Sequence, residues 1–312
     1  MNIENITTPI NYLGDEIGNK LFIKREDLIP YSFGGNKARK AQLFFEDIQQ
    51  GDCDCIVTYG SSSSNHCRVI SNIACSKNLP CYIISPQEVS IPTYNSKMMK
   101  LFGAEIVTVP VNEVHATIEN KLFELKRNGK LPYFIPGGGH GNLGTHAYVN
   151  CYNEIKHFED KYGIHFDYIF HASGTGTTQA GLVCGQVIHK DKRKIVGISI
   201  ARKLPRGRDV ILESIYDYLT TKGISFARAE VESATVFIDS FTGVGYGSKT
   251  SDQTIEYALK KYGIPLDGTY TGKAFDGMLK LIQTEDIVDS NILFIHTGGT
   301  PLFFDYLQRL NI

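Results

Sequence analysis

Short, almost continuously apolar runs alternate along the chain with longer stretches of helical pattern. Runs rich in β-branched and aromatic residues predict strands at 54–59, 81–85, 106–109, 168–172, 195–200 and 292–296. Apolar strands separated by helices of about 10–15 residues are typical of parallel sheets that are covered on both faces. The pattern therefore predicts an α/β fold with mostly parallel sheets in three α/β/α layers.

The turns that follow these strands are unusually rich in Gly, Ser and Thr. Ligands in parallel α/β folds bind beyond the carboxyl ends of the strands, so chemistry is expected in these turns. Three of them follow predicted strands, and two more segments are rich in glycine; the five lie at 60–66, 173–178, 297–301, 136–144 and 32–37.

The turn from Ser173 to Thr178 has the features of a phosphate cradle. Its glycines let backbone N–H groups turn toward one point, and the helix that follows adds its positive dipole end. The turn is neither a P-loop nor a GxGxxG fingerprint, because Gln179 stands where the third glycine would be. It favours the phosphate of a cofactor over a nucleotide, and an ordinary turn capped by Ser and Thr is the alternative.

Lys37 follows the pair Gly34 and Gly35 at the predicted start of a helix. Partial desolvation and the helix dipole both lower the pKa of an amine, which makes it a nucleophile toward a carbonyl group. The alternative is a solvated lysine in a basic helix, because Arg39 and Lys40 follow.

Composition limits the classes of partner. The chain has 312 residues, 42% apolar and 21% charged, which is enough for two lobes around a cleft. A net charge of −1 gives no global field that attracts nucleic acid or an anionic membrane. No run approaches the roughly 18 apolar residues of a membrane span, and the first residues do not read as a secretion signal.

The cysteines indicate a reducing compartment. There are seven, an odd number, without a CxxC pair, so we expect no disulfide framework and a cytoplasmic protein. Cys53-Asp54-Cys55 could be half of a metal site, but no second ligand pair has zinc-like spacing. We therefore expect no metal.

Several short segments together resemble one enzyme family. Residues 24–27 (KRED) and 33–40 (FGGNKARK) resemble the Schiff-base lysine segment of the pyridoxal 5'-phosphate (PLP)-dependent 1-aminocyclopropane-1-carboxylate deaminase / D-cysteine desulfhydrase family. That family has the tryptophan-synthase-β-like fold, PLP fold type II. Its later landmarks are matched in the same order at 64–66, 174–181, 245–247, 270–273 and 296–299.

The resemblance implies roles for individual residues toward the cofactor. Lys37 would hold PLP as an imine and later move the α-proton of the substrate. Asn65 would hydrogen-bond the ring hydroxyl oxygen of PLP. The phosphate would lie in the turn formed by Gly174, Thr175, Gly176, Thr177 and Thr178.

Other residues would border the substrate. Ser64 would face it from a helix N-terminus, with a helix cap as the structural alternative, and His66 would lie beside it. Tyr246 and Tyr270 would flank the substrate as acid, base or leaving-group contacts.

Thr271 separates two branches of the family. In the deaminase, a glutamate at this position pairs with the pyridine nitrogen, whereas desulfhydrase-like members have threonine, as here. A hydroxyl keeps the ring protonated less well than a carboxylate, so the electron sink is weaker. That suits loss of a good β-leaving group better than opening of a cyclopropane, and His66 points the same way because the deaminases tend to have glutamine there.

We therefore expect a PLP-dependent lyase that carries out α,β-elimination on a small amino acid, giving ammonia and a 2-oxo acid. Ring opening of 1-aminocyclopropane-1-carboxylate is one alternative. β-Replacement is another, because the family's Gly-Gly-x-Gln-Ser-Asn is here changed to Gly60-Ser61-Ser62-Ser63-Ser64-Asn65. A silent, ligand-binding relative is disfavoured because Lys37 is retained.

The resemblance also implies an organisation. A small domain at 40–148 would be inserted into a large PLP-binding domain made of 1–39 and 149–312. The catalytic lysine and phosphate turn would come from the large domain, and Ser64 and Asn65 from the small one. The family also suggests a homodimer.

Overall fold

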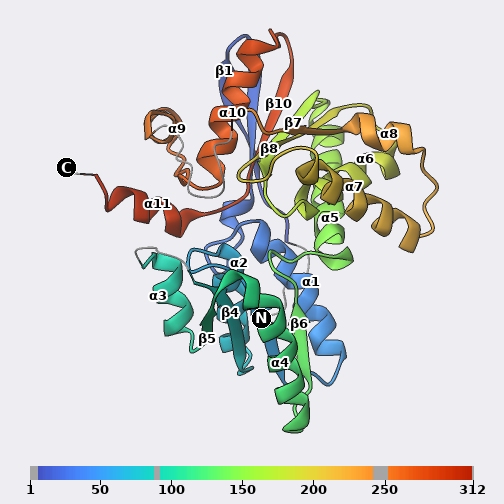
Figure 1. The fold of residues 1–312 in the computed structure, drawn as a ribbon. Helices are drawn as coiled ribbons and strands as arrows, with labels where there is room; N and C mark the ends of the chain where they lie inside the picture. The colour runs from blue at the N-terminus through green and yellow to red at the C-terminus, as the bar shows by residue number, and fades with distance from the viewer. Residues whose placement is uncertain (1–5, 88–91, 242–251, 311–312) are drawn as a thin grey trace.

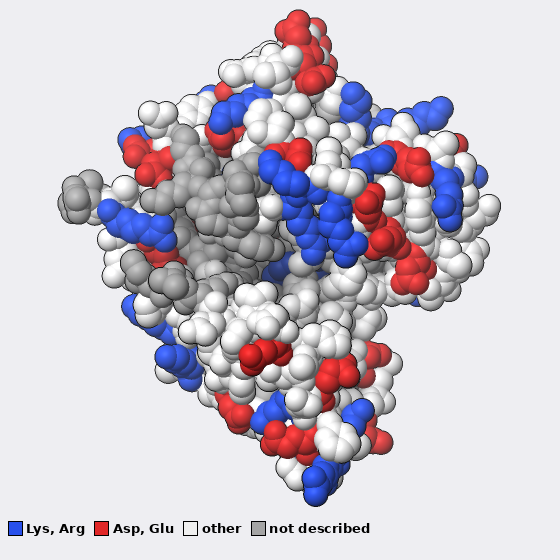
Figure 2. Space-filling model, viewed as in Figure 1, with Lys and Arg blue, Asp and Glu red and all other residues white. Residues whose placement is uncertain are grey.

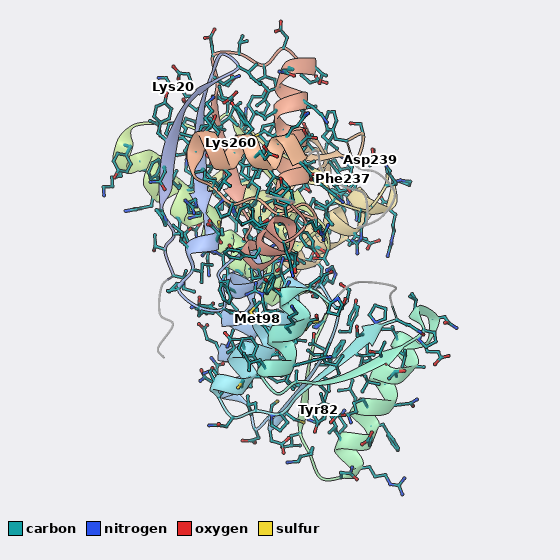
Figure 3. The ribbon with its side chains drawn as sticks, turned by 90° about the vertical axis from the view of Figure 1, so that its left-hand side faces the viewer. Lys20, Tyr82, Met98, Phe237, Asp239 and Lys260 are labelled. Atoms are coloured by element: carbon teal, nitrogen blue, oxygen red, sulfur yellow. The ribbon has the colours of Figure 1, made fainter. Side chains whose placement is uncertain are left out.

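Figure 1 shows a computed structural model of the chain, which describes residues 6–87, 92–241 and 252–310. Two sheets lie one above the other, each with its own helices, and Figure 3 shows the same two lobes from the side. Tyr82 and Met98 lie in the lower lobe there, and Lys20, Phe237 and Lys260 in the upper one. The predicted α/β fold with two lobes is confirmed.

The upper lobe is built on a six-stranded sheet of order β1-β2-β10-β7-β8-β9. Only β1 and β2 pair antiparallel; the other neighbours are parallel. The strands are β1 (Ile10–Glu16), β2 (Asn19–Arg25), β10 (Asn291–His296), β7 (Tyr168–Ser173), β8 (Lys194–Ser199) and β9 (Thr235–Ile238).

The lower lobe is built on a four-stranded, fully parallel sheet of order β5-β4-β3-β6. Its strands are β5 (Glu105–Val109), β4 (Cys81–Pro86), β3 (Cys55–Tyr59) and β6 (Pro132–Ile135). All six strands predicted from the sequence are present, and β1, β2, β6 and β9 are additional. The charged side chains of β2 hide its strand pattern, whereas β6 and β9 are four-residue apolar runs, as short as the predicted run 106–109, and were not predicted.

Helices cover both faces of each sheet, which gives the predicted three layers. In the upper lobe, one core packs α5, α6 and α7 on the sheet, and a second core packs α9 and α10 on the opposite face. In the lower lobe, α1 and α2 cover one face and α4 the other. The helices are α1 (Asn36–Gln50), α2 (Asn65–Ser76), α3 (Tyr94–Leu101), α4 (Val114–Arg127), α5 (Asn142–Tyr162), α6 (Thr177–His189), α7 (Arg206–Thr221), α8 (Arg228–Ala234), α9 (Asp252–Tyr262), α10 (Thr271–Thr284) and α11 (Thr300–Leu307), with 3-10 turns η1 (Glu26–Leu28) and η2 (Val111–Glu113).

Two helices run between the lobes. The four-stranded sheet lies within residues 55–135, whereas α1 begins before residue 40 and α5 continues past residue 148. The expected boundaries at 40 and 148 therefore fall inside α1 and α5, and as domain boundaries they stay a prediction. No helix in the described part of the chain is long and apolar enough to cross a membrane.

A buried cluster of charges joins α1 to the upper lobe. Arg39 of α1 pairs with Glu26 of η1 and, at 2.6 Å, with Glu154 of α5. Lys24 of β2 lies 2.6 Å from Glu154 and 3.7 Å from Glu26. Burial raises the pKa of the Glu26 carboxyl, but the charges of Arg39 and Lys24 outweigh burial and bring it down to about 2. The cluster thus fixes the helix that carries Lys37.

The start of α1 lies directly against the turn after β10. The N–H of Asn36 donates to the carbonyl of Thr297 at 2.9 Å. A Cβ on Gly35, whose φ is +95°, would lie 2.7 Å from that carbonyl oxygen, and one on Gly298 would lie 2.6 Å from the Cα of Gly35. Two glycines are needed here because the two backbones touch.

Replacing Glu26 with Gln should destabilise the fold by about 3–5 kcal/mol, because two buried cations lose part of their counter-charge. The Glu26 pKa is about 2 in the fold against an ordinary 4.5, so its contribution is complete above pH 4.5 and is lost as the pH falls toward 2. Urea unfolding across this pH range measures both effects, and the variant should lose less stability on acidification than the wild type.

The control is Glu105→Gln, which removes a surface ion pair with Lys121. The Glu105 side chain is 56% exposed. It should change stability by no more than about 1 kcal/mol. Equal losses from both variants would contradict a special role for the buried cluster.

Candidate active site

Lys37 is the second residue of α1 and points its amine into the protein. Its Nζ donates to the carbonyl oxygen of Gly138 at 3.1 Å. Burial lowers the pKa of the amine to about 8 from its ordinary 10.5. No described carboxylate pairs with it, so a substantial neutral fraction is present near neutral pH, as a carbonyl-binding amine requires.

The turn from Ser173 to Thr178 joins the end of β7 to the start of α6. Gly176 is the N-cap, with φ +102° and no side-chain cap, so the first N–H groups of α6 are open to an anion. Asn36 Nδ2 donates to the Thr178 hydroxyl at 3.1 Å, which ties the turn to the start of α1. Gly174 and Thr175 are half-buried and the rest of the turn is buried.

The amine and the turn face one small space. A Cβ placed on Gly138 would lie 3.3 Å from Lys37 Nζ, 3.0 Å from Thr175 Oγ1 and 2.6 Å from Thr175 Cγ2. This juxtaposition of an amine and an anion-binding turn is what a molecule with a carbonyl group at one end and a phosphate at the other requires. The Lys37 amine without a described carboxylate partner, the open helix terminus and the side-chain-free wall at Gly138 all suit PLP.

Lys40 is a second buried lysine at this site, and the sequence interpretation treated it only as part of a basic helix. Its Nζ donates to the Thr177 hydroxyl at 2.6 Å, and it is 1% exposed. Burial, and then the charge of Lys37, hold its pKa well below the ordinary value. The sequence does contain a sign of this role, because Lys40 lies three residues after Lys37 and residues three apart share one face of a helix. Lys40 could supply positive charge to a phosphate in the turn.

The lower lobe presents Ser64, Asn65 and His66 at the start of α2. Ser64 Oγ accepts the Cys67 N–H at 3.2 Å, so the hydroxyl does act as the helix cap. Asn65 is half-buried, and its Oδ1 accepts a hydrogen bond from Asn95 at 2.9 Å. No local pattern points to Asn95, which lies thirty residues farther along the chain.

His66 is buried and neutral. Its Nε2 lies 2.9 Å from the Thr58 hydroxyl, which donates its one proton to the carbonyl of Ile135 at 2.7 Å. His66 must therefore donate from Nε2, which leaves Nδ1 unprotonated. Burial first, then the charges of Lys37 and Lys40, hold its pKa well below the ordinary value. Its Nε2 faces the core, so any contact with substrate would involve the other edge of the ring.

Thr271 and Tyr270 lie at the start of α10. The Thr271 hydroxyl donates to Asp267 Oδ2 at 2.7 Å and accepts the Asp267 N–H at 3.0 Å. Asp267 is fully buried, and burial raises the pKa of its carboxyl although backbone N–H groups, including that of Tyr270 at 2.7 Å, oppose the rise. Asp267 was not singled out in the sequence, and its spacing of four residues before Thr271 was the only hint. Tyr246 lies outside the described residues.

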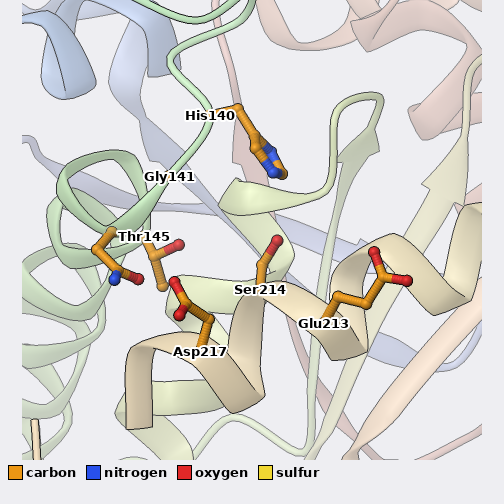
Figure 4. A pocket seen from close by; sticks show the side chains of 7 residues that line it. His140, Gly141, Thr145, Glu213, Ser214 and Asp217 are labelled. Atoms are coloured by element: carbon orange, nitrogen blue, oxygen red, sulfur yellow. The ribbon is translucent and has the colours of Figure 1, made fainter. Parts of the chain in front are cut away.

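A hollow lies between the two lobes in Figure 2, and Lys and Arg side chains gather above it. Arg202 donates to the Thr175 carbonyl at 3.2 Å. Figure 4 shows a neighbouring cavity of about 230 Å³ between the start of α5 and the side of α7. It is lined by His140, Gly141, Asn142, Thr145, Glu213, Ser214 and Asp217. Lys37 and Gly138 are not among its lining residues, so this cavity is not the direct surroundings of the amine.

Comparisons with known proteins agree with this geometry. The model of the family described as pyridoxal-phosphate dependent enzyme matches residues 4–298. A Pyrococcus abyssi protein, provisionally named 1-aminocyclopropane-1-carboxylate deaminase, is 32% identical over 309 residues, covering 97% of this chain and 92% of that protein. D-cysteine desulfhydrase of Yersinia enterocolitica is 29% identical over 307 residues, covering 95% and 92%.

Solved structures show the same fold. An ACC deaminase homologue superposes with a TM-score of 0.86 at 32% identity, covering 98% of this chain and 93% of that chain. A hydrogen sulfide-producing enzyme from Fusobacterium nucleatum superposes with a TM-score of 0.63 at 18% identity, covering 94% and 95%, which is a likeness of fold alone.

The rate at which PLP attaches to the apoprotein should rise with pH and reach half of its maximum near pH 8, because the neutral Lys37 amine is the nucleophile and its pKa is about 8. The growth of visible absorbance after mixing measures this rate. A free lysine amine of ordinary pKa, treated in parallel, should keep gaining rate above pH 9. A midpoint near the ordinary 10.5 in the protein would contradict the lowered pKa.

Gly138→Ala should weaken PLP binding by about ten-fold or more, because the new Cβ would push Thr175 and the phosphate turn away. Gly129→Ala is the matched control, since Gly129 has a similar φ of +77° but no atom within 4 Å of its Cβ position. Both variants bear the same left-handed backbone cost of about 1–2 kcal/mol. Fluorescence titration with PLP separates them; equal affinities would show that Gly138 does not border the cofactor.

Proposed function

Because the chain belongs to the pyridoxal-phosphate dependent enzyme family, we propose that it catalyses α,β-elimination from a small amino acid, in the manner implied by the name D-cysteine desulfhydrase. The observation that carries the proposal is the buried Lys37 amine facing the Ser173–Thr178 turn across Gly138. This pair of features supports a carbonyl cofactor anchored by its phosphate, and the residues around it decide the chemistry.

The residues of this chain divide the work of holding the cofactor. The open N–H groups at the start of α6, the hydroxyls of Thr177 and Thr178, and the amine of Lys40 suit the phosphate. Lys37 would hold the carbonyl carbon, and Asn65 would donate to the ring oxygen. When bound, PLP supplies an electron sink for the electron pair left on the α-carbon of the substrate.

Lys37 is also the proposed proton carrier. An amine with a pKa of about 8 accepts a proton near neutral pH and returns it readily. It would take the proton from the α-carbon, and the bond from the β-carbon to sulfur would break with its electron pair leaving on sulfur as a thiolate, which then takes up a proton. Hydrolysis of the released enamine then gives ammonia and a 2-oxo acid. The N-terminus of α2, beside Ser64, suits the substrate carboxylate.

Thr271 supports elimination over ring opening. Its hydroxyl proton is directed to Asp267, so it can offer the cofactor ring only an uncharged oxygen. An uncharged acceptor stabilises a protonated pyridine less than a carboxylate does, which leaves a weaker electron sink. A thiol is a good leaving group and requires less delocalisation than the carbon–carbon bond of a cyclopropane.

β-Replacement is the second candidate, and the serine turn supports it. Ser61 to Ser64 are half-buried, and the Ser61 and Ser63 hydroxyls lie 3.2 Å apart. Hydroxyls at the start of α2 could hold a polar second substrate. We also propose a homodimer, as the family resemblance implies, and a cytoplasmic location, which the seven free cysteines favour.

Purified protein reconstituted with PLP should release pyruvate from D-cysteine or 3-chloro-D-alanine faster than 2-oxobutyrate from 1-aminocyclopropane-1-carboxylate. L-Cysteine and D-serine complete the panel, and Lys37→Ala is the control, expected to lose turnover. Equal or faster formation of 2-oxobutyrate would contradict the interpretation of Thr271. Product formed only when a thiol or amine is added would favour β-replacement.

A further inference from the structure

We propose that Asn95 is a positioning residue that decides which end of the Asn65 amide meets the cofactor. The inference rests on the proposed function, in which Asn65 binds the ring oxygen of PLP. Asn95 is the second residue of α3 and is completely buried. It does not need to touch the cofactor to act, because it acts through Asn65.

One amide nitrogen makes both of Asn95's described hydrogen bonds. Its Nδ2 donates to the Ser63 carbonyl at 2.8 Å and to Asn65 Oδ1 at 2.9 Å. Its Oδ1 is buried and has no partner among the described residues. A buried oxygen without a partner is unfavourable. The two hydrogen bonds donated by Nδ2 are therefore the contacts that favour an asparagine at this position.

These contacts determine the orientation of both amides. The Ser63 carbonyl can only accept, so the NH2 end of Asn95 must face it. The same NH2 group reaches Asn65, so the Asn65 atom nearest to it must be the oxygen. The Nδ2 of Asn65 is therefore turned away from Asn95 and is left free to donate.

A donor at this place suits an oxygen with negative charge. Asn65 is the first residue of α2, where the helix dipole is also positive. If the amide were reversed, its oxygen would face the ring oxygen of the cofactor, and two acceptors would repel each other. Asn95 thus excludes the unfavourable orientation before the cofactor binds.

The neighbouring residues tie Asn95 to the upper lobe. The N–H of Tyr94 donates to Asp305 of α11, at 3.0 Å to Oδ1 and 3.3 Å to Oδ2. The Thr93 hydroxyl donates to the Ser62 carbonyl at 3.1 Å. Asn95 therefore lies where α3 meets both the serine turn and α11, and its position is fixed from two sides.

The test is a double-mutant cycle of Asn95→Asp and Asn65→Ala, with PLP as the probe. Asn95→Asp keeps the shape but replaces the donor by an acceptor, so Asn65 should turn its oxygen toward the cofactor. PLP affinity of the apoprotein should fall by about ten-fold or more in the Asn65 background, and clearly less in the Asn65→Ala background. The cycle subtracts the effect of the added charge itself.

A spectroscopic readout separates positioning from general damage. The pH midpoint of the visible absorbance of bound PLP should move upward in Asn95→Asp, because the ring oxygen loses a donor. The move should be smaller once Asn65 is alanine. Asn120→Asp, on the exposed face of α4, is the control and should leave affinity and midpoint unchanged. If Asn95→Asp does not fold, Asn95→Ala, which removes the donor without adding charge, makes the same comparison.

Two results would overturn the inference: equal losses in both backgrounds, or wild-type PLP affinity in Asn65→Ala. The first would show that Asn95 acts on the fold and not on Asn65, and the second that Asn65 does not hold the cofactor. Normal PLP binding without any turnover of the amino-acid panel would instead count against the proposed reaction and leave the role of Asn95 intact.

Discussion

The buried pairing of Arg39 with Glu26 and Glu154 is the contact on which the site depends. It joins α1, which carries Lys37, to η1 and to the long helix α5 that crosses between the lobes. Lys24 completes the cluster from β2. Separating a buried ion pair leaves an uncompensated buried charge, which is strongly unfavourable, so the chain is held in the arrangement that keeps these groups together. Here that arrangement places the amine opposite the phosphate turn.

The site itself is short of negative charge. The described structure shows no carboxylate paired with Lys37 or Lys40, and burial lowers the pKa of both amines. An anionic ligand would supply the missing counter-charge and, by binding only the folded chain, would add to its stability. In the empty site, burial therefore favours the neutral form of both amines more than water does, and a phosphate in the turn would stabilise their charged form.

Local patterns in the sequence were sufficient for part of this picture. The glycine pair before Lys37 and the Ser173–Thr178 turn are read from adjacent residues, and the six predicted strands from their apolar runs. The strand β2 was missed because Lys24 is charged, and the half-buried partner of Lys24, Glu154, lies 130 residues away. Asn95 and Asp267 were missed for a related reason: each acts on a site residue through a contact that composition and spacing do not reveal.

The touching backbones of Gly35 and Gly298 have an evolutionary consequence. A side chain at either position would enter the backbone of the other segment, so neither glycine can be exchanged while its partner segment stays in place. The two segments are 263 positions apart, yet a change in one requires a compensating change in the other. In related sequences, a residue other than glycine at one of these positions should therefore be accompanied by an insertion, a deletion or a changed turn at the other.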